Sequence, residues 1–282
     1  MAITAADVKA LREKTGAGPM ECKNALTECG GDREKAEKLL KEKGLAAAEK
    51  RADRATNQGR VSIKIAGAKA ALVEMSTETD FVARNPEFIA LGDAIAARAI
   101  EKGIAAPNDE LNGLVKDLAT KIRENMSLKR LCVVEAGPGE YIESYIHGDG
   151  AIGVVVVIAA DKPEILGQQG VKSFVHDLAL HIAAFNPQAV SKDKIDGAQI
   201  SEQQELLRKQ MEGDEKLKGK PAGVLEGILK GKVDKWLSAI CLLDQNFVKD
   251  DKLTVAAALA GAGKAAGGTL SVKDYRYFRA GC

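Results

Sequence analysis

Aromatic residues are scarce in this chain. They make up 4% of its 282 residues, with one Trp. A single aromatic side chain at the surface would therefore carry unusual weight, because aromatic anchors dominate many protein interfaces. The net charge is also close to zero, at +1 from 41 basic and 40 acidic residues. Nucleic-acid-binding proteins usually need a clearly basic face, so the composition predicts no direct nucleic-acid partner.

Long hydrophobic runs are missing as well. No apolar stretch approaches the roughly 20 residues that cross a bilayer, and the N-terminus lacks the basic and apolar regions of a signal peptide. The cysteines are odd in number, scattered and without CxxC spacing: Cys22, Cys29, Cys132, Cys241 and Cys282. Such thiols are typical of a reducing compartment. We therefore expect a cytoplasmic protein with no membrane partner.

A phosphate-binding loop is suggested by Gly263 and Lys264 but is incomplete. Such a loop needs a Gly five residues before this pair and a Ser or Thr after the Lys. Ala258 and Ala265 occupy those positions. Residues 261–264 are better interpreted as a flexible Ala/Gly connection, and we expect no nucleotide cofactor.

Metal-binding and catalytic patterns are also lacking. His176 and His181 lie five residues apart on one expected helix, so they point about 140° apart and cannot hold one metal ion from the same face. Asp177 and His181, four residues apart, are spaced to pair with each other instead. The sequence therefore predicts no metal, no catalytic residue and a protein that is not an enzyme.

Helix start and stop signals divide the N-terminal region into three short helices. Thr4 is a suitable N-cap, Gly16 and Gly18 end the first helix, and Pro19 suits the first turn of the second. Asp32 then caps a third helix. Three short helices in so few residues make a small bundle, which is marginally stable alone.

The remainder of the chain predicts an α+β core. The composition shifts to Ala, Lys and Arg over residues 43–60, so we place a domain boundary after residue 55. A hairpin followed by a loop and an amphipathic helix then occurs twice, starting near residues 60 and 140. We expect two related subdomains, at 56–140 and 141–282, each with a sheet packed on helices.

A helical hairpin interrupts the second subdomain at about 191–240. Two helical patterns flank a polar link at 212–220, and Pro221 starts the second of them. With only two helices and few neighbours, the hairpin should project from the body of the protein.

The segment 79–88 is the most informative stretch. It follows an apolar run at 70–75 that indicates a buried strand, and it precedes a helical pattern that begins near Phe88. Phe81 lies between the two, beside the carboxylate of Asp80. Large apolar residues are usually buried, so Phe81 could be a core anchor. The alternative is that Phe81 points outward and enters a partner protein.

Three motifs carry a family resemblance. They are the pentapeptide Thr79-Asp-Phe-Val-Ala83, the segment Leu11-Arg-Glu-Lys-Thr-Gly-Ala-Gly18, and the stretch from Tyr145 to Gly153. With these motifs the chain resembles elongation factor Ts from about residue 3 to about residue 280. That family is the guanine-nucleotide exchange factor of the translation factor elongation factor Tu. The resemblance implies a ubiquitin-associated-like domain for the N-terminal bundle and an antiparallel coiled coil for the helical hairpin.

The resemblance also implies the partner and the residues that contact it. The partner would be elongation factor Tu in its GDP-bound and nucleotide-free states, and the factor could act as a homodimer or in a 2:2 complex. Phe81 would enter the partner's GTP-binding domain near its magnesium site, with Asp80 beside it. Besides Phe81, the implied partner-binding set of this chain contains seven positions: Thr79, Asp80, Val82, Arg12, Met20, Lys23 and His147. His147 is expected in a tight turn at 147–150 that contacts another domain of the partner.

Two departures from the family pattern affect this expectation. Pro19 replaces the apolar side chain that many members carry, which puts one contact in doubt. Many members also continue beyond the position of Cys282 into a helix that touches the partner, so that contact is expected to be absent. A different class of function, a nucleic-acid-associated scaffold that uses the lysines of the helical hairpin, is the alternative. It would need a basic face with aromatic side chains for stacking.

Overall fold

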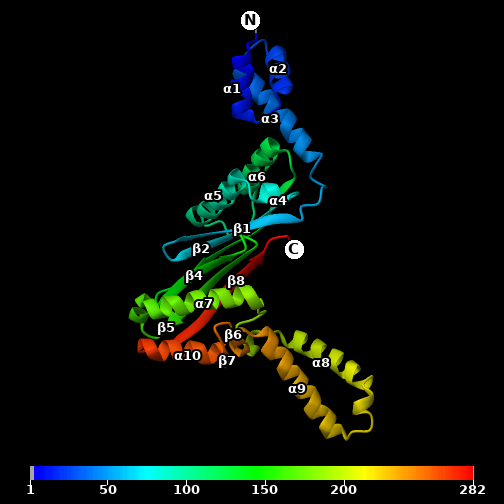
Figure 1. The fold of residues 1–282 in the computed structure, drawn as a ribbon, viewed down its shortest axis with the longest axis vertical. Coiled ribbons are helices and arrows are strands. Elements are labelled where there is room, and N and C mark those ends of the chain that lie inside the picture. Colours follow the sequence, from blue (N-terminus) through cyan, green and yellow to red (C-terminus); the bar gives the residue numbers. More distant parts are fainter. Residues whose placement is uncertain (1–2, 282) are drawn as a thin grey trace. The chain divides into compact units, whose positions relative to one another are not determined.

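The computed structural model describes residues 3–281, so Cys282 lies outside the described residues. The fold is α+β, with ten α-helices and eight strands in the described part of the chain (Figure 1). The chain forms two compact units. The first comprises the described residues of 1–135, 146–153 and 278–282, and the second comprises 136–145 and 154–277.

The first unit begins with three helices: α1 (Ala5–Thr15), α2 (Pro19–Glu28) and α3 (Arg33–Glu49). The predicted caps are present, because the side chain of Thr4 accepts a hydrogen bond from the Asp7 amide and Asp32 accepts one from the Lys35 amide. Gly16 ends α1 in the left-handed conformation, with φ of 68°. A small apolar core holds the helices together: Leu11, Ala17, Cys22, Ala25, Leu26 and Ala36.

A three-stranded antiparallel sheet follows, with the order β1-β2-β3. The strands are β1 (Gln58–Ala66), β2 (Lys69–Thr77) and β3 (Met126–Glu135). The central strand β2 is buried from Ala70 to Thr77 because it has a neighbour on each side and a helix over one face. Its one buried carboxylate, Glu74, is paired with Arg130 on β3.

Three helices complete the core of this unit: α4 (Asp80–Ala83), α5 (Pro86–Lys102) and α6 (Asp109–Ile122). Helix α5 lies close on the sheet, because a Cβ added at Gly92 would meet the Ser62 Oγ at 2.6 Å. Side chains from β2, β3 and all three helices share one apolar cluster, which includes Met75, Val82, Phe88, Ile95 and Leu111.

The second sheet has the order β4-β5-β8. Its strands are β4 (Glu140–His147), β5 (Ile152–Ala160) and β8 (Leu270–Arg279). In the second unit, helix α7 (Gln169–Phe185) packs with α10 (Val255–Ala266). A short hairpin of β6 (Asn246–Phe247) and β7 (Asp250–Thr254) precedes α10. Four 3₁₀ turns lie in this part of the chain: Pro163–Gly167, Lys192–Lys194, Glu215–Leu217 and Leu242–Asp244.

Helices α8 (Gly197–Glu212) and α9 (Ala222–Ile240) form the helical hairpin of the second unit (Figure 1). They pack through their own apolar seam, which includes Leu207, Met211, Leu229, Val233 and Leu237. Because this seam gives α8 and α9 an apolar core of their own, the hairpin does not need to pack along α7 and α10.

Several sequence-based boundaries were wrong in detail. Residues 261–266 continue helix α10 instead of forming a flexible connection, because the Ala-rich sequence supports a helix until Gly267 ends it at φ of 87°. The Thr79–Ala83 stretch, expected as a loop, contains the single helical turn α4. His147 is the last residue of β4, and the turn begins after it.

Candidate functional site

The helical turn α4 exposes one aromatic side chain. Phe81 is 84% exposed, whereas its neighbour Val82 is 7% exposed and belongs to the core of the sheet and helices. Adjacent residues on one helical turn point in different directions, so anchoring Val82 turns Phe81 toward solvent. The interpretation of Phe81 as a core anchor is therefore wrong.

Hydrogen bonds to one carboxylate hold the start of this turn. Thr79 donates to Glu124 twice, from its amide at 3.1 Å and from its hydroxyl at 2.8 Å. Thr77 donates to the same carboxylate from its hydroxyl at 3.0 Å. The Thr79 hydroxyl in turn accepts from the Val82 amide at 3.4 Å and caps α4. The exposed Phe81 thus stands on a turn that is fixed on its buried side.

Asp80 lies at the surface beside Phe81. Its carboxylate pairs with Arg84 at 3.6 Å, and both side chains are at least half-exposed. Exposed pairs of this kind contribute at most about 1 kcal/mol and are screened by salt. The Asp80 carboxylate can therefore exchange Arg84 for a partner group at little cost.

The N-terminal bundle places its three candidate residues at the surface. Arg12 lies on α1, and Met20 and Lys23 lie on α2; all three are exposed, Met20 by 64%. Pro19 is the first residue of α2, where its missing N–H leaves no helical hydrogen bond unmade. An exposed Met beside a Lys forms a flexible apolar contact with a positive rim.

His147 is exposed at the end of β4, in the segment 146–153 that belongs to the first unit. The turn after it is held to β1, because the Val61 amide donates to the Gly150 carbonyl at 2.8 Å. The Arg60 guanidinium also donates to the carbonyl of Asp149. All eight candidate residues therefore lie in the first compact unit, on three surface segments.

Three residues that the sequence did not single out support two of these segments. Arg123, Glu124 and Asn125 directly follow α6, and Glu124 carries the hydrogen bonds to Thr77 and Thr79. Arg123 forms an ion pair with Glu21 on α2, and this contact is the first cause of a lowered pKa of Glu21. Their partners lie more than 40 residues away in the sequence, so local patterns could not identify them.

Metal sites and membrane spans were also sought. Among residues 3–281, His, Cys, Asp and Glu side chains nowhere gather in the groups of three or more that could hold a metal ion. In the same range, every helix is too short or too polar to cross a bilayer. The surface residues described above therefore remain the candidate site.

Comparison with known proteins identifies the family. The family model described as elongation factor TS matches residues 78–282. A protein of Treponema denticola named Elongation factor Ts is 52% identical over 281 residues, covering 100% of this chain and 99% of that protein. Proteins of the same name from Treponema pallidum and Borreliella burgdorferi are 46% and 39% identical, covering 96% and 99% of this chain and the same shares of their own lengths. The chain therefore belongs to the elongation factor Ts family, a family of translation elongation factors.

Proposed function

We propose that this protein is the guanine-nucleotide exchange factor of elongation factor Tu, and that Phe81 is the residue that drives GDP release. The observation that carries the proposal is the 84% exposure of Phe81 on a turn anchored by Val82 and Glu124. Exposing a large apolar side chain to water is unfavourable, at about 25 cal/mol for each Å² of apolar surface. An exposed aromatic side chain on a fixed turn is the kind of anchor that enters a pocket of a partner protein.

The proposed mechanism is reciprocal coupling. Phe81 inserts between helices of the partner's GTP-binding domain, and Asp80 lies beside it near the partner's magnesium site. Magnesium and backbone amides hold a bound diphosphate, so a displacement of either lowers the affinity for GDP. By thermodynamic linkage, bound GDP must lower the partner's affinity for this protein by the same ratio as this protein lowers the affinity for GDP.

The other candidate residues supply binding without acting on the nucleotide site directly. Arg12, Met20 and Lys23 on the bundle contact the GTP-binding domain, and His147 contacts a second domain of the partner. Thr79 and Val82 set the position of Phe81 through the cap and the core. The factor binds the GDP-bound and the nucleotide-free partner, since exchange requires both.

We also propose the finer organisation of the chain. Residues 1–55 form a ubiquitin-associated-like domain, 56–140 and 141–282 form two related subdomains, and the α8–α9 hairpin is a coiled-coil protrusion. The factor is not an enzyme, because it makes and breaks no covalent bond in this mechanism. It uses no cofactor of its own, it works in the cytoplasm as a partner of the translation machinery, and it forms a homodimer or a 2:2 complex.

A nucleic-acid-associated scaffold is the competing function. Lysines of the helical hairpin are its support, and titration with labelled single-stranded RNA at low and moderate salt would detect it. Salt-sensitive binding that is lost when hairpin lysines are replaced would favour the scaffold.

Release of fluorescent GDP from elongation factor Tu of the same source tests exchange directly. The protein should accelerate release in a concentration-dependent and saturable way. An unchanged release rate at saturating concentrations would overturn the proposed function.

A further inference from the structure

Three consecutive residues link two of the candidate surfaces of the first unit. Arg123, Glu124 and Asn125 follow the last turn of α6, and Arg123 is in the left-handed conformation with φ of 69°. A non-glycine residue rarely adopts this conformation, which here turns the chain out of α6. The three side chains then contact three different segments: helix α2, the residues before α4, and the linker after α3.

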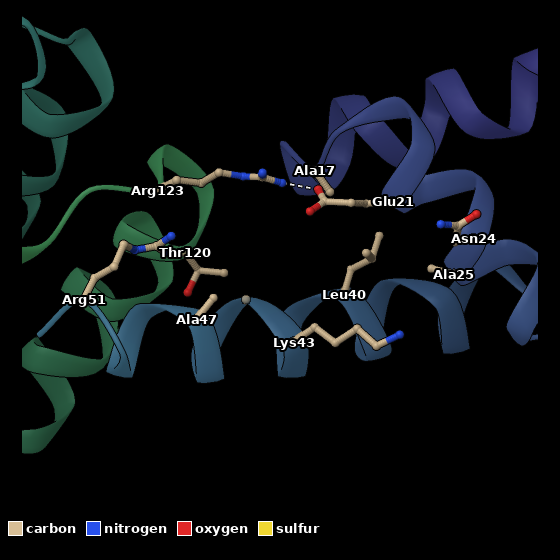
Figure 2. A pocket seen from close by; sticks show the side chains of 11 residues that line it. Ala17, Glu21, Asn24, Ala25, Leu40, Lys43, Ala47, Arg51, Thr120 and Arg123 are labelled. Carbon is tan, nitrogen blue, oxygen red and sulfur yellow. Dashed lines mark hydrogen bonds and ion pairs between the residues drawn. The ribbon is translucent and has the colours of Figure 1, made fainter.

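The contact of Arg123 is with the N-terminal bundle. Its guanidinium donates to Glu21 on α2, as the dashed line in Figure 2 shows. Glu21 also accepts a hydrogen bond from the Gly18 amide at 2.8 Å, so the same carboxylate fixes the start of α2. Met20 precedes Glu21 directly and Lys23 follows two residues later. Arg123 therefore binds the part of α2 that presents the candidate contact residues.

Close approach of helix α3 to α6 supports the same contact. A Cβ added at Gly44 would lie 2.2 Å from the Thr120 Cγ2, so only glycine fits there without a shift. Lys41 and Asp117 also pair at 3.0 Å. Between the helices remains a cavity of about 230 Å³, which Arg123 and Glu21 help to line (Figure 2). The contacts between the bundle and α6 thus include this close approach of α3 and the two ion pairs, Arg123 with Glu21 and Lys41 with Asp117.

Glu124 and Asn125 act on the other side. Glu124 accepts the three hydrogen bonds from Thr77 and Thr79 that fix the base of the Phe81 turn. The Asn125 amide donates to Glu78 at 2.6 Å, and its side chain donates to the carbonyls of Ala52 and Arg54. The linker between bundle and sheet is therefore attached to the same short segment.

We propose that Arg123, Glu124 and Asn125 are positioning residues, which hold the α2 surface and the Phe81 turn in one fixed arrangement for the partner. None of the three needs to touch the partner. A preorganised arrangement avoids the entropy cost of ordering two surfaces during binding. This proposal rests on the proposed exchange function, which it deepens by assigning the residues that prepare the binding surface.

Two variants separate the two halves of this segment in the GDP-release assay. Arg123→Ala should raise the half-saturating concentration of the factor about three- to fivefold and leave the maximal release rate within about twofold, since a half-exposed pair is worth up to about fivefold in affinity. Glu124→Ala should lower the maximal rate about tenfold, because it loosens the turn that carries Phe81. Glu124→Gln keeps the shape and most of the hydrogen bonds and should restore the rate to within about threefold of the wild type.

Coupling and a matched control distinguish positioning from general damage. Glu21→Gln and Arg123→Ala should be non-additive, because each removes the same contact. Arg98→Ala, which removes a comparable exposed pair between α5 and Glu110 in the first turn of α6, should behave like the wild type. Additive effects of the first pair, or an equal effect of Arg98→Ala, would overturn the proposal.

Amide hydrogen exchange, measured on the protein without its partner, tests the positioning role independently of the proposed nucleotide-exchange function. Glu124→Ala should accelerate exchange at the amides of residues 79–83 about tenfold or more, with the melting temperature within a few degrees of the wild type. If Glu124→Ala leaves the exchange rates of these amides unchanged, the positioning role is overturned, whatever the wild-type protein does in the GDP-release assay. If Glu124→Ala accelerates exchange at these amides as expected, but the wild-type protein does not stimulate GDP release from elongation factor Tu, only the proposed function is refuted.

Discussion

Phe81 and Val82 are consecutive residues of α4 with opposite environments: the first is 84% exposed and the second 7% exposed. This contrast makes the two residues a matched pair for experiment. Both are apolar, both lie in the pentapeptide of residues 79–83, and only one contributes to the core.

Truncation of the two side chains should therefore separate stability from exchange. Phe81→Ala should change the unfolding free energy by no more than about 0.5 kcal/mol, as surface substitutions do. It should slow stimulated GDP release roughly thirtyfold, because a central aromatic anchor is worth about 2 kcal/mol. Val82→Ala should instead cost about 2 kcal/mol of stability, at about 0.8 kcal/mol for each lost methyl group plus a cavity term. Chemical denaturation and release kinetics measure both. Severe destabilisation by Phe81→Ala with normal release per folded molecule would contradict the proposed role.

The sequence predicted the elements around this turn better than the turn itself. The helical pattern expected to begin near Phe88 is confirmed as helix α5. The helix starts at Pro86, because Asn85 caps it, and Gly103 ends it at φ of 66°. The sequence pattern of strand β3 becomes clearly apolar only from Leu131, although the strand begins at Met126. In the first half of the strand, polar residues such as Lys129 and Arg130 separate the apolar ones, so this half lacks the apolar run that marks a buried strand.

The candidate site shows the same division. The family motif identified Phe81, yet the sequence alone allowed a buried or an exposed side chain, because Phe81 and Val82 are both apolar. Only the packing of Val82 into the core decides between them. Glu124 was missed altogether, since its partners Thr77 and Thr79 are joined to it by folding and not by local spacing.

Asp80 should act together with Phe81. The two residues are adjacent, and both are proposed to disturb the same magnesium-linked element of the partner. Neighbouring residues that share one target are non-additive, so Asp80→Ala should cost less in the Phe81→Ala background than in the wild type. Arg84→Ala is the control, because it removes the charge that pairs with Asp80 and leaves the carboxylate in place. A double-mutant cycle on GDP release measures the coupling, and strictly additive effects would separate the two roles.

His147 should contribute to binding and not to stability. Its side chain is exposed at the end of β4, where substitutions usually change the unfolding free energy by no more than about 0.5 kcal/mol. His147→Ala should therefore weaken the complex, by about three- to tenfold for a contact worth about 1 kcal/mol. Calorimetric titration of the complex and thermal melting of the free factor test this together. A large fall in melting temperature with unchanged affinity would assign His147 to the fold.

His181 should make the second unit sensitive to mild acid. The expected pairing of Asp177 with His181 was wrong: Asp177 pairs with Lys249 at 3.1 Å, and His181 is fully buried. Its Nδ1 accepts a hydrogen bond from the Val248 amide at 3.2 Å, so the proton of the neutral ring lies on Nε2, 2.9 Å from the Gln245 Oε1. Burial lowers the pKa of His181 below its ordinary value of 6.5, against the opposing effect of the Gln245 hydrogen bond.

The direction of the pH effect follows from these contacts. The unfolded chain binds the proton more readily than the folded one, so the contribution to stability is complete above about pH 6.5 and is lost as the pH falls below it. The loss is at most about 1.4 kcal/mol for each pH unit. Denaturant unfolding at pH 7.5 and pH 5.5, above the range where ordinary carboxylates titrate, should show this difference. The difference should shrink in His181→Gln and persist in His176→Gln, whose ring is exposed on the same helix. Equal pH dependence in the wild type and His181→Gln would show that another group titrates.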